Sequence, residues 1–327
     1  MLRALITAGP LRHWPGIYRD VLKNGGFAMV EPPGNDNLTP EQQRELMPQC
    51  DAVIAGGEPI GADLIAASER LRVIARVGVG YDAVDVPAAT KHGVVVTITP
   101  GTNEGSVAEH AFALMLGVAR QVARLDALVR RGEWERPVAR PLRGQTLGLV
   151  GLGRIGKAMV PRAQAFGMRV VACDPVADPD FDFQHGLKRL SLDDLLRESD
   201  IVSLHAPMTE TTRHLIDARA FGVMRPGAML INTSRGGLVD EAALIDALRA
   251  GKVQGAGLDV FDPEPPLPDN PLLTMPNVVL APHIGGQDDR SLADMAALAC
   301  QCVVDLSKGL WPEGCIVNRE LGPNWHW

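Results

Sequence analysis

The sequence lacks the long apolar segments of membrane and secreted proteins. Its 327 residues hold no apolar run of about 18 residues, which a spanning helix needs. Glu109 and His110 interrupt the richest apolar stretch, and the N-terminal residues lack the apolar core of a signal peptide. We therefore expect a cytoplasmic protein with no membrane partner.

Cysteine is scarce, and its spacing suits neither cross-links nor metal ions. The five cysteines form no CxxC pair, no disulfide framework and no metal-ligand array; they are Cys50, Cys173, Cys300, Cys302 and Cys315. Free thiols in a reducing compartment, and no metal site, are expected.

Basic residues are fewer than acidic residues. Lys and Arg number 32 against 39 Asp and Glu, which gives a formal net charge of −7 with both signs spread along the chain. Such a chain does not build the basic surface that binds nucleic acid, so we expect no nucleic-acid partner. A small anionic substrate must then be attracted by a few local cations.

Short β-branched runs alternate with helical stretches from the N-terminus onward. The first predicted strands are Leu2–Thr7, Phe27–Glu31, Ala52–Ala55, Val73–Ala75 and Val94–Thr97. The helical stretches among them are Gly16–Asn24, Pro40–Met47, Ala62–Glu69 and Pro87–Lys91. Near-continuous apolar strands with crossover helices indicate a parallel sheet covered on both faces.

The alternation restarts after a long helix predicted over Ser106–Arg131. The later strands are Thr146–Val150, Arg169–Cys173, Ile201–Leu204, Ala228–Asn232, Gly255–Leu258 and Val278–Ala281. The later helices are Arg154–Phe166, Ser191–Glu198, Glu241–Ala250 and Asp288–Lys308. The chain is therefore predicted to be α/β, with two doubly wound parallel-sheet domains and an active-site cleft between them.

A glycine-rich turn follows the strand Thr146–Val150 and opens the next helix. In the motif Gly-Leu-Gly-Arg-Ile-Gly, Gly151 permits a tight turn, Gly153 lets the backbone approach a pyrophosphate, and Gly156 lets helix pack on strand. The helix N-terminus favours phosphates. Asp174 stands 23 positions after Gly151 (174 − 151), where a carboxylate binds ribose hydroxyls and repels a 2′-phosphate. This context predicts a Rossmann domain that binds NAD rather than NADP.

Three further residues follow predicted strands and suit acid–base chemistry on a keto acid. They are Arg235, Glu264 and His283. Ligands of open α/β sheets bind beyond the carboxyl ends of strands, so the three could converge in one crevice. Arginine can clamp a carboxylate bidentately, and histidine can exchange a hydroxyl proton near neutral pH. A glutamate can orient the imidazole and favour its protonated form. Each residue alone could be structural, but together they point to catalysis.

These segments, the glycine motif and the stretch Val77–Asp85 closely resemble the D-isomer-specific 2-hydroxyacid dehydrogenases over essentially the whole chain. The resemblance implies an NAD-dependent oxidoreductase acting on a CH–OH group, with reversible hydride transfer between NAD(H) and a small 2-hydroxy or 2-keto acid. It also implies that Arg235 binds the substrate carboxylate, that His283 is the general acid/base, and that Glu264 is its partner.

The resemblance implies further contacts and an assembly. The substrate would also be held by Arg76, Val77, Gly78 and Gly80. The cofactor contacts would be Gly151, Gly153, Arg154, Ile155, Gly156, Asp174, Pro207, Thr233, Asp259, Gly286 and Val79. Family members usually dimerise through the nucleotide domain, so a homodimer is expected. The first domain is expected to be a flavodoxin-like substrate domain.

The last helix begins after the second sheet is complete. Its apolar residues, together with Trp311 and Val317 in the tail, need a surface to cover, so we expect them to return to the first domain. The predicted domains are a discontinuous substrate-binding domain, residues 1–100 and 287–327, and an NAD-binding Rossmann domain, residues 101–286.

The sequence leaves the substrate open. Glu264 in place of an amide argues against the formate dehydrogenase branch, whereas the loop from Arg76 to Gly80 looks most like phosphoglycerate dehydrogenases. Those enzymes often carry an arginine where the loop Ala55–Pro59 has alanine and glycine. The first interpretation is a phosphoglycerate dehydrogenase-like enzyme, and the alternative is a glyoxylate/hydroxypyruvate reductase. Bulkier keto acids are also possible substrates.

Two non-enzymatic readings also fit the motifs. Some proteins of this fold keep the catalytic set and act as NAD(H)-sensing transcriptional corepressors, and a cofactor-binding protein without turnover is a third reading. The sequence shows no low-complexity or basic regulatory tail, which favours the enzyme.

Overall fold

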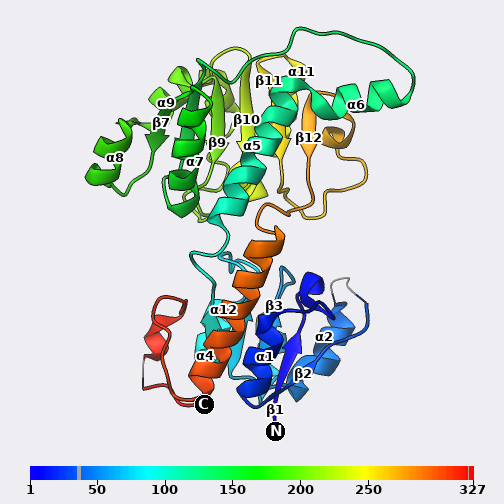
Figure 1. Cartoon of the computed structure of the whole chain (residues 1–327), viewed down its shortest axis with the longest axis vertical. Coiled ribbons are helices and arrows are strands. Elements are labelled where there is room, and N and C mark those ends of the chain that lie inside the picture. The colour runs from blue at the N-terminus through cyan, green and yellow to red at the C-terminus, as the bar shows by residue number, and fades with distance from the viewer. Residues whose placement is uncertain (35–37, 323) are drawn as a thin grey trace. The chain divides into compact units, whose positions relative to one another are not determined.

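The computed structural model describes residues 1–34, 38–322 and 324–327, which divide into two compact units. Unit 1 comprises Met1–Asn103 and Gln287–Trp327, and unit 2 comprises Glu104–Gly286. Each unit is built on one parallel sheet with helices on its faces (Figure 1). The predicted α/β fold with two parallel sheets is confirmed.

Unit 1 contains a five-stranded sheet in the order β2-β1-β3-β4-β5. Its strands are β1 (Leu2–Ile6), β2 (Phe27–Val30), β3 (Ala52–Ala55), β4 (Val73–Arg76) and β5 (Val95–Thr97). The chain runs first to one side of β1 and then to the other, so the order reverses between β1 and β3. This is the flavodoxin-like order.

Helices cover both faces of this sheet. They are α1 (Ile17–Asn24), α2 (Pro40–Leu46), α3 (Ala62–Ala66), α4 (Val86–Lys91) and α12 (Asp289–Ser307), with 3-10 turns η1 (Gly9–Leu11), η2 (Met47–Gln49) and η5 (Arg319–Leu321). Helix α12 lies beside α1 (Figure 1), and Leu22, Ala299 and Val303 pack with Ile6 in one buried core. The core of the opposite face includes Ile65.

Unit 2 contains a seven-stranded sheet in the order β12-β11-β10-β9-β6-β7-β8. Its strands are β6 (Thr146–Val150), β7 (Arg169–Cys173), β8 (Lys188–Arg189), β9 (Ile201–Leu204), β10 (Ala228–Asn232), β11 (Val253–Leu258) and β12 (Val278–Leu280). The pairing register sets one row of terminal residues level across the sheet: Cys173, Val150, Leu204, Asn232, Leu258 and Leu280. The loops after these strands therefore leave the sheet along a single edge.

The helices of unit 2 also form two layers. They are α5 (Glu104–Arg120), α6 (Val122–Arg130), α7 (Arg154–Ala165), α8 (Pro179–His185), α9 (Leu192–Glu198), α10 (Ala218–Val223) and α11 (Glu241–Arg249), with 3-10 turns η3 (Gly236–Leu238) and η4 (Pro271–Thr274). Met115 of α5 and Met159 of α7 belong to the core of one face. Leu195, Phe221 and Leu244, from α9, α10 and α11, belong to the core of the other.

Some elements differ from the predicted ones. The single helix predicted over Ser106–Arg131 is wrong, because Gln121 has a left-handed backbone (φ 54°) that separates α5 from α6. The short elements α8, β8 and α10 were not predicted. No side chain of α8 is fully buried, so its sequence carries little apolar periodicity.

Among the described helices, none combines the length and the apolarity that crossing a bilayer requires.

Candidate active site

The glycine-rich turn leaves β6 where the strand order of unit 2 reverses, between β6 and β9. Gly151 has a φ of 96°, and a Cβ there would lie 2.6 Å from the carbonyl carbon of His205, after β9. A Cβ on Gly156 would lie 2.3 Å from the Gly151 carbonyl oxygen, so α7 packs directly on the turn. Only glycine fits at these two positions without a shift of the backbone.

Gly153, in contrast to Gly151 and Gly156, has open space around it, since a Cβ built there meets no other atom nearby. It is the N-cap of α7, whose first turn directs backbone N–H groups outward. Asp174, after β7, accepts hydrogen bonds from the backbone N–H groups of Leu152 (2.6 Å) and Val176 (2.7 Å). Its carboxylate is therefore fixed beside the turn. An open backbone, a helix N-terminus and a fixed carboxylate fit the phosphates and ribose of NAD.

The other predicted cofactor residues of unit 2 lie along the same edge. Arg154 and Ile155 begin α7, Pro207, Thr233 and Asp259 follow β9, β10 and β11, and Gly286 ends the unit. His205 is also on this edge, with Nε2 2.9 Å from the Ser203 hydroxyl oxygen. Burial lowers the pKa of His205 to about 4, so it is a neutral structural group at physiological pH.

Arg235 lies in a tight turn after β10. The Asn232 side chain shapes this turn, because its Oδ1 accepts from the Ser234 N–H (3.0 Å) and its Nδ2 donates to the Arg235 carbonyl (2.8 Å). Arg235 Nη1 donates to the Ser234 carbonyl at 2.6 Å. A Cβ on Gly236 would lie 2.0 Å from the Phe261 carbonyl carbon, so this turn and the loop after β11 are in close backbone contact.

Glu264 and His283, two of the predicted catalytic side chains, are in direct contact. His283 Nδ1 lies 2.7 Å from Glu264 Oε2, and Glu264 Oε1 accepts from the Phe261 N–H at 3.0 Å. Burial acts to raise the pKa of Glu264. The His283 hydrogen bond and charge, the Phe261 N–H and the Arg235 charge outweigh it and hold that pKa below its usual value. Glu264 is therefore a carboxylate at neutral pH, and it orients the imidazole ring.

Asp259 holds the turn that carries His283. Its backbone carbonyl accepts from the His283 N–H (2.8 Å), and its carboxylate accepts from the Ile284 N–H (2.9 Å) and the Gly285 N–H (2.8 Å). A Cβ on Gly285 would lie 2.9 Å from Asp259 Oδ2. Burial acts to raise the pKa of Asp259, but the His110 contact and the two N–H groups lower it overall. Asp259 is thus a second ionised carboxylate in this region.

Two residues of α5 that the sequence did not single out also reach this turn. His110 Nε2 lies 3.2 Å from Asp259 Oδ1, and the Ser106 hydroxyl donates to the Gly285 carbonyl at 2.8 Å. Ser106 and Gly285 are 179 positions apart, so no local pattern reveals the contact.

The predicted substrate loop in unit 1 follows β4. The Arg76 guanidinium is buried, with the residue 8% exposed, and its Nε donates to the Gly80 carbonyl at 3.0 Å. Gly78 has a φ of 147°, and its N–H donates to Thr99 Oγ1 at 3.0 Å. Val77 and Val79 lie within this loop, whose shape these contacts set.

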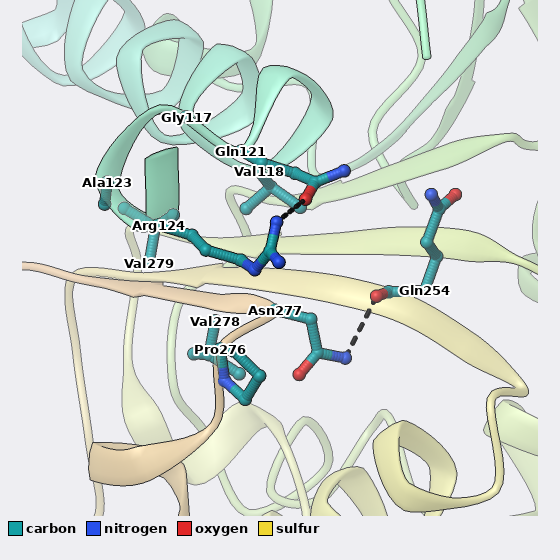
Figure 2. A pocket seen from close by; sticks show the side chains of 10 residues that line it. All are labelled: Gly117, Val118, Gln121, Ala123, Arg124, Gln254, Pro276, Asn277, Val278 and Val279. Carbon is teal, nitrogen blue, oxygen red and sulfur yellow. Dashed lines mark hydrogen bonds between the residues drawn. The ribbon is translucent and has the colours of Figure 1, made fainter. Parts of the chain in front are cut away.

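A cavity of about 210 Å³ lies at the other edge of the seven-stranded sheet (Figure 2). Gln121 and Arg124 line it where α5 gives way to α6, and Gln254 and Asn277 line it where β11 and β12 begin. Parallel strands all run in one direction, so this edge is opposite the one that carries Arg235 and the glycine turn. The cavity is therefore separate from the predicted chemistry.

Residues 112–285 match the family model described as D-isomer specific 2-hydroxyacid dehydrogenase, NAD binding domain. The chain is 42% identical over 284 residues to a glyoxylate reductase of Korarchaeum cryptofilum, covering 85% of each protein. It is 39% identical over 308 residues to a D-3-phosphoglycerate dehydrogenase of Archaeoglobus fulgidus, covering 93% of this chain but 58% of that protein. The chain thus spans little more than half of that second relative.

Solved structures agree with these matches. The D-lactate dehydrogenase of Aquifex aeolicus, determined as a complex with NAD and lactic acid, aligns with a TM-score of 0.84 and 31% sequence identity. The alignment covers 98% of this chain and 100% of that one.

Proposed function

The chain belongs to the D-isomer-specific 2-hydroxyacid dehydrogenase family, and from that premise we propose which of its residues perform the reaction and on which substrates. As a member it is an NAD-dependent oxidoreductase that acts on the CH–OH group of a D-2-hydroxy acid. The observation that carries the proposal is the His283–Glu264 contact of 2.7 Å, in the same unit as the glycine turn.

NAD, when bound, accepts or supplies the hydride of the reaction. Arg235 provides two directed N–H donors to the substrate carboxylate, which fixes the keto or hydroxy carbon and polarises its oxygen. His283 gives a proton to the oxygen during reduction and takes it back during oxidation, through Nε2, the ring nitrogen opposite the Glu264 contact. Glu264 stabilises the protonated imidazole and is a positioning residue rather than a proton carrier.

The remaining predicted residues bind the two ligands. We assign the phosphates to the turn of Gly151, Gly153 and Gly156, and the ribose hydroxyls to Asp174, which disfavours NADP by charge repulsion. The predicted contacts of Arg154, Ile155, Pro207, Thr233, Asp259, Gly286 and Val79 are part of this proposal. Residues 76–80 contribute backbone N–H groups to the substrate carboxylate.

Small 2-keto acids without a phosphate, such as glyoxylate or hydroxypyruvate, are our preferred substrates. Arg76 is the cation of the predicted substrate loop, and it is buried and bonded to the Gly80 carbonyl. The loop Ala55–Pro59 adds no cation either. The glyoxylate reductase match over most of both chains supports this choice. 3-Phosphoglycerate is the second candidate, supported by the phosphoglycerate dehydrogenase match.

Steady-state rates with a panel of substrates test the proposal. Glyoxylate, hydroxypyruvate and 3-phosphohydroxypyruvate would each be reduced with NADH and with NADPH. We expect NADH to be preferred and the two unphosphorylated acids to have the higher kcat/KM. A higher kcat/KM for the phosphorylated acid would reverse the substrate choice. Tight NADH binding without turnover of any acid would favour the NAD(H)-sensing corepressor.

We also propose that the protein is a cytoplasmic homodimer that associates through unit 2. Large apolar side chains are exposed on α6 and on the loop after it, namely Val122, Val129, Trp134 and Val138. Exposed apolar patches of this kind are typical of interaction surfaces. The five free cysteines suit a reducing compartment.

A further inference from the structure

The turn that carries His283 has an unfavourable backbone and is held from two sides. His283 has a φ of 54°, which residues other than glycine rarely adopt. On one side, Asp259 binds the turn through its carbonyl and both carboxylate oxygens. On the other side, Ser106 of α5 holds the Gly285 carbonyl. Such a conformation persists only where the surroundings impose it.

His110 completes this arrangement. It lies one helical turn after Ser106 on α5, and its Nε2 is 3.2 Å from the Asp259 oxygen that also accepts from the Ile284 N–H. The Asp259 side chain is 1% exposed, so water does little to solvate its charge. A buried carboxylate needs a cation or several hydrogen-bond donors. His110 places an imidazole nitrogen beside this carboxylate, in addition to the backbone N–H groups of Ile284 and Gly285.

We propose that His110 is a positioning residue for His283, which acts through Asp259. Its imidazole packs Nε2 against Asp259 Oδ1 and keeps that carboxylate in place against the turn. Without this contact, Asp259 keeps its backbone donors but can move, and the turn is held less firmly. The inference rests on the proposed role of His283 as the general acid/base.

The other titratable groups around α5 do not replace His110. On α5 itself, Glu109 pairs with Arg162 of α7 at 3.1 Å. Arg235 follows β10, and His283 follows β12. Glu264, the partner of His283, follows β11. Among these described groups, His110 is the one whose side chain contacts the Asp259 carboxylate.

A positioning role should leave a different signature from a role in proton transfer. Proton transfer through His283 reverses with the reaction, so changes there affect reduction and oxidation in opposite senses as pH changes. Loss of the His110 contact should lower kcat in both directions, because both directions use the same turn.

His110→Gln tests this assignment. Glutamine keeps an N–H donor for Asp259 but cannot gain or lose a proton. We therefore expect kcat in both directions, measured at saturating cofactor, to stay within a few-fold of the wild type. His110→Ala removes the donor as well and should lower kcat at least about tenfold at every pH, with little change in KM.

Glu109→Gln is the matched control, because it removes a charge beside His110 on an exposed side chain. Its kcat should equal that of the wild type in both directions, and thermal unfolding would show that all variants are folded. Wild-type kcat in His110→Ala, or a His110→Gln variant as slow as His110→Ala, would overturn the proposal.

A measurement without turnover separates this inference from the proposed function. The histidine ring signals in NMR spectra, with His110 assigned from its loss in His110→Gln, report the contact directly. In Asp259→Asn the His110 ring signal should move away from its wild-type position. If it does not, the contact fails; if no keto acid is reduced by the wild type, the proposed function fails instead.

Discussion

At the scale of single residues, the site depends on buried carboxylates that stay ionised. The pKa of Glu264 and that of Asp259 are both lowered, although burial alone would raise them. One backbone N–H at Glu264, two at Asp259, and an imidazole in each case oppose the effect of burial. A carboxylate with both oxygens engaged has little freedom to rotate. Each can therefore fix a histidine or the turn that carries one.

Glu264→Gln tests the charge of the histidine's partner. The variant keeps an acceptor for His283 but removes the negative charge that favours the imidazolium. The protonated imidazole is then less stabilised, so the alkaline limb of the reduction profile should move to lower pH and oxidation should begin to rise earlier. The measurement is kcat/KM against pH at saturating cofactor. A limb that moved to higher pH would contradict the assigned role.

Arg235→Lys tests the carboxylate clamp. Lysine keeps the positive charge but cannot offer two parallel donors in a fixed plane. We expect kcat/KM to fall at least about a hundredfold, or about 2.7 kcal/mol, while NADH affinity measured by fluorescence stays within a few-fold. Near wild-type kcat/KM would remove Arg235 from the substrate contacts.

At the scale of elements, the glycine turn and the first residues of α7 are in close backbone contact. Gly156→Ala places a Cβ about 2.3 Å from the Gly151 carbonyl oxygen, so the turn or the helix must shift. We expect NADH to bind at least about tenfold more weakly, a loss of about 1.4 kcal/mol.

Gly222→Ala is the control for this substitution. Gly222 is in α10, and a Cβ there meets open space. Its NADH affinity, measured by the same titration, should be unchanged. Equal affinities for the two variants would show that close packing at Gly156 does not support the cofactor site.

The existence of most helices and strands was predictable, but breaks and short elements were not. The apolar periodicity continues from α5 into α6, so it hides the left-handed residue Gln121. Hydrophobic patterning reports which side chains are buried, and one backbone angle hardly changes it. The same limit explains α8, whose side chains are not fully buried.

At the scale of the whole molecule, the exposed apolar surface of α6 and its loop is the basis of the proposed dimer. Trp134 is 73% exposed and Val138 is 99% exposed. A double variant, Trp134→Glu with Val138→Glu, should shift the protein toward monomer, because it buries charge without partners in the interface. Sedimentation velocity over a range of concentrations measures the shift.

Phe183→Glu serves as the control for this dimer test, since Phe183 of α8 is 91% exposed on another part of unit 2. It should sediment like the wild type. A wild type that is monomeric at all concentrations would refute the dimer itself.

The sequence by itself determined the two parallel sheets, the glycine turn with Asp174, and the identity of Arg235, Glu264 and His283 as candidates. These features are local, because hydrophobic periodicity, turn glycines and strand-end motifs can each be recognised within a short stretch of consecutive residues. Only the tertiary structure decided that strand ends are level along one edge, that Asp259 and Ser106 bind the His283 turn, and that His110 lies beside Asp259. Those contacts join residues far apart in the chain, and packing alone brings them together.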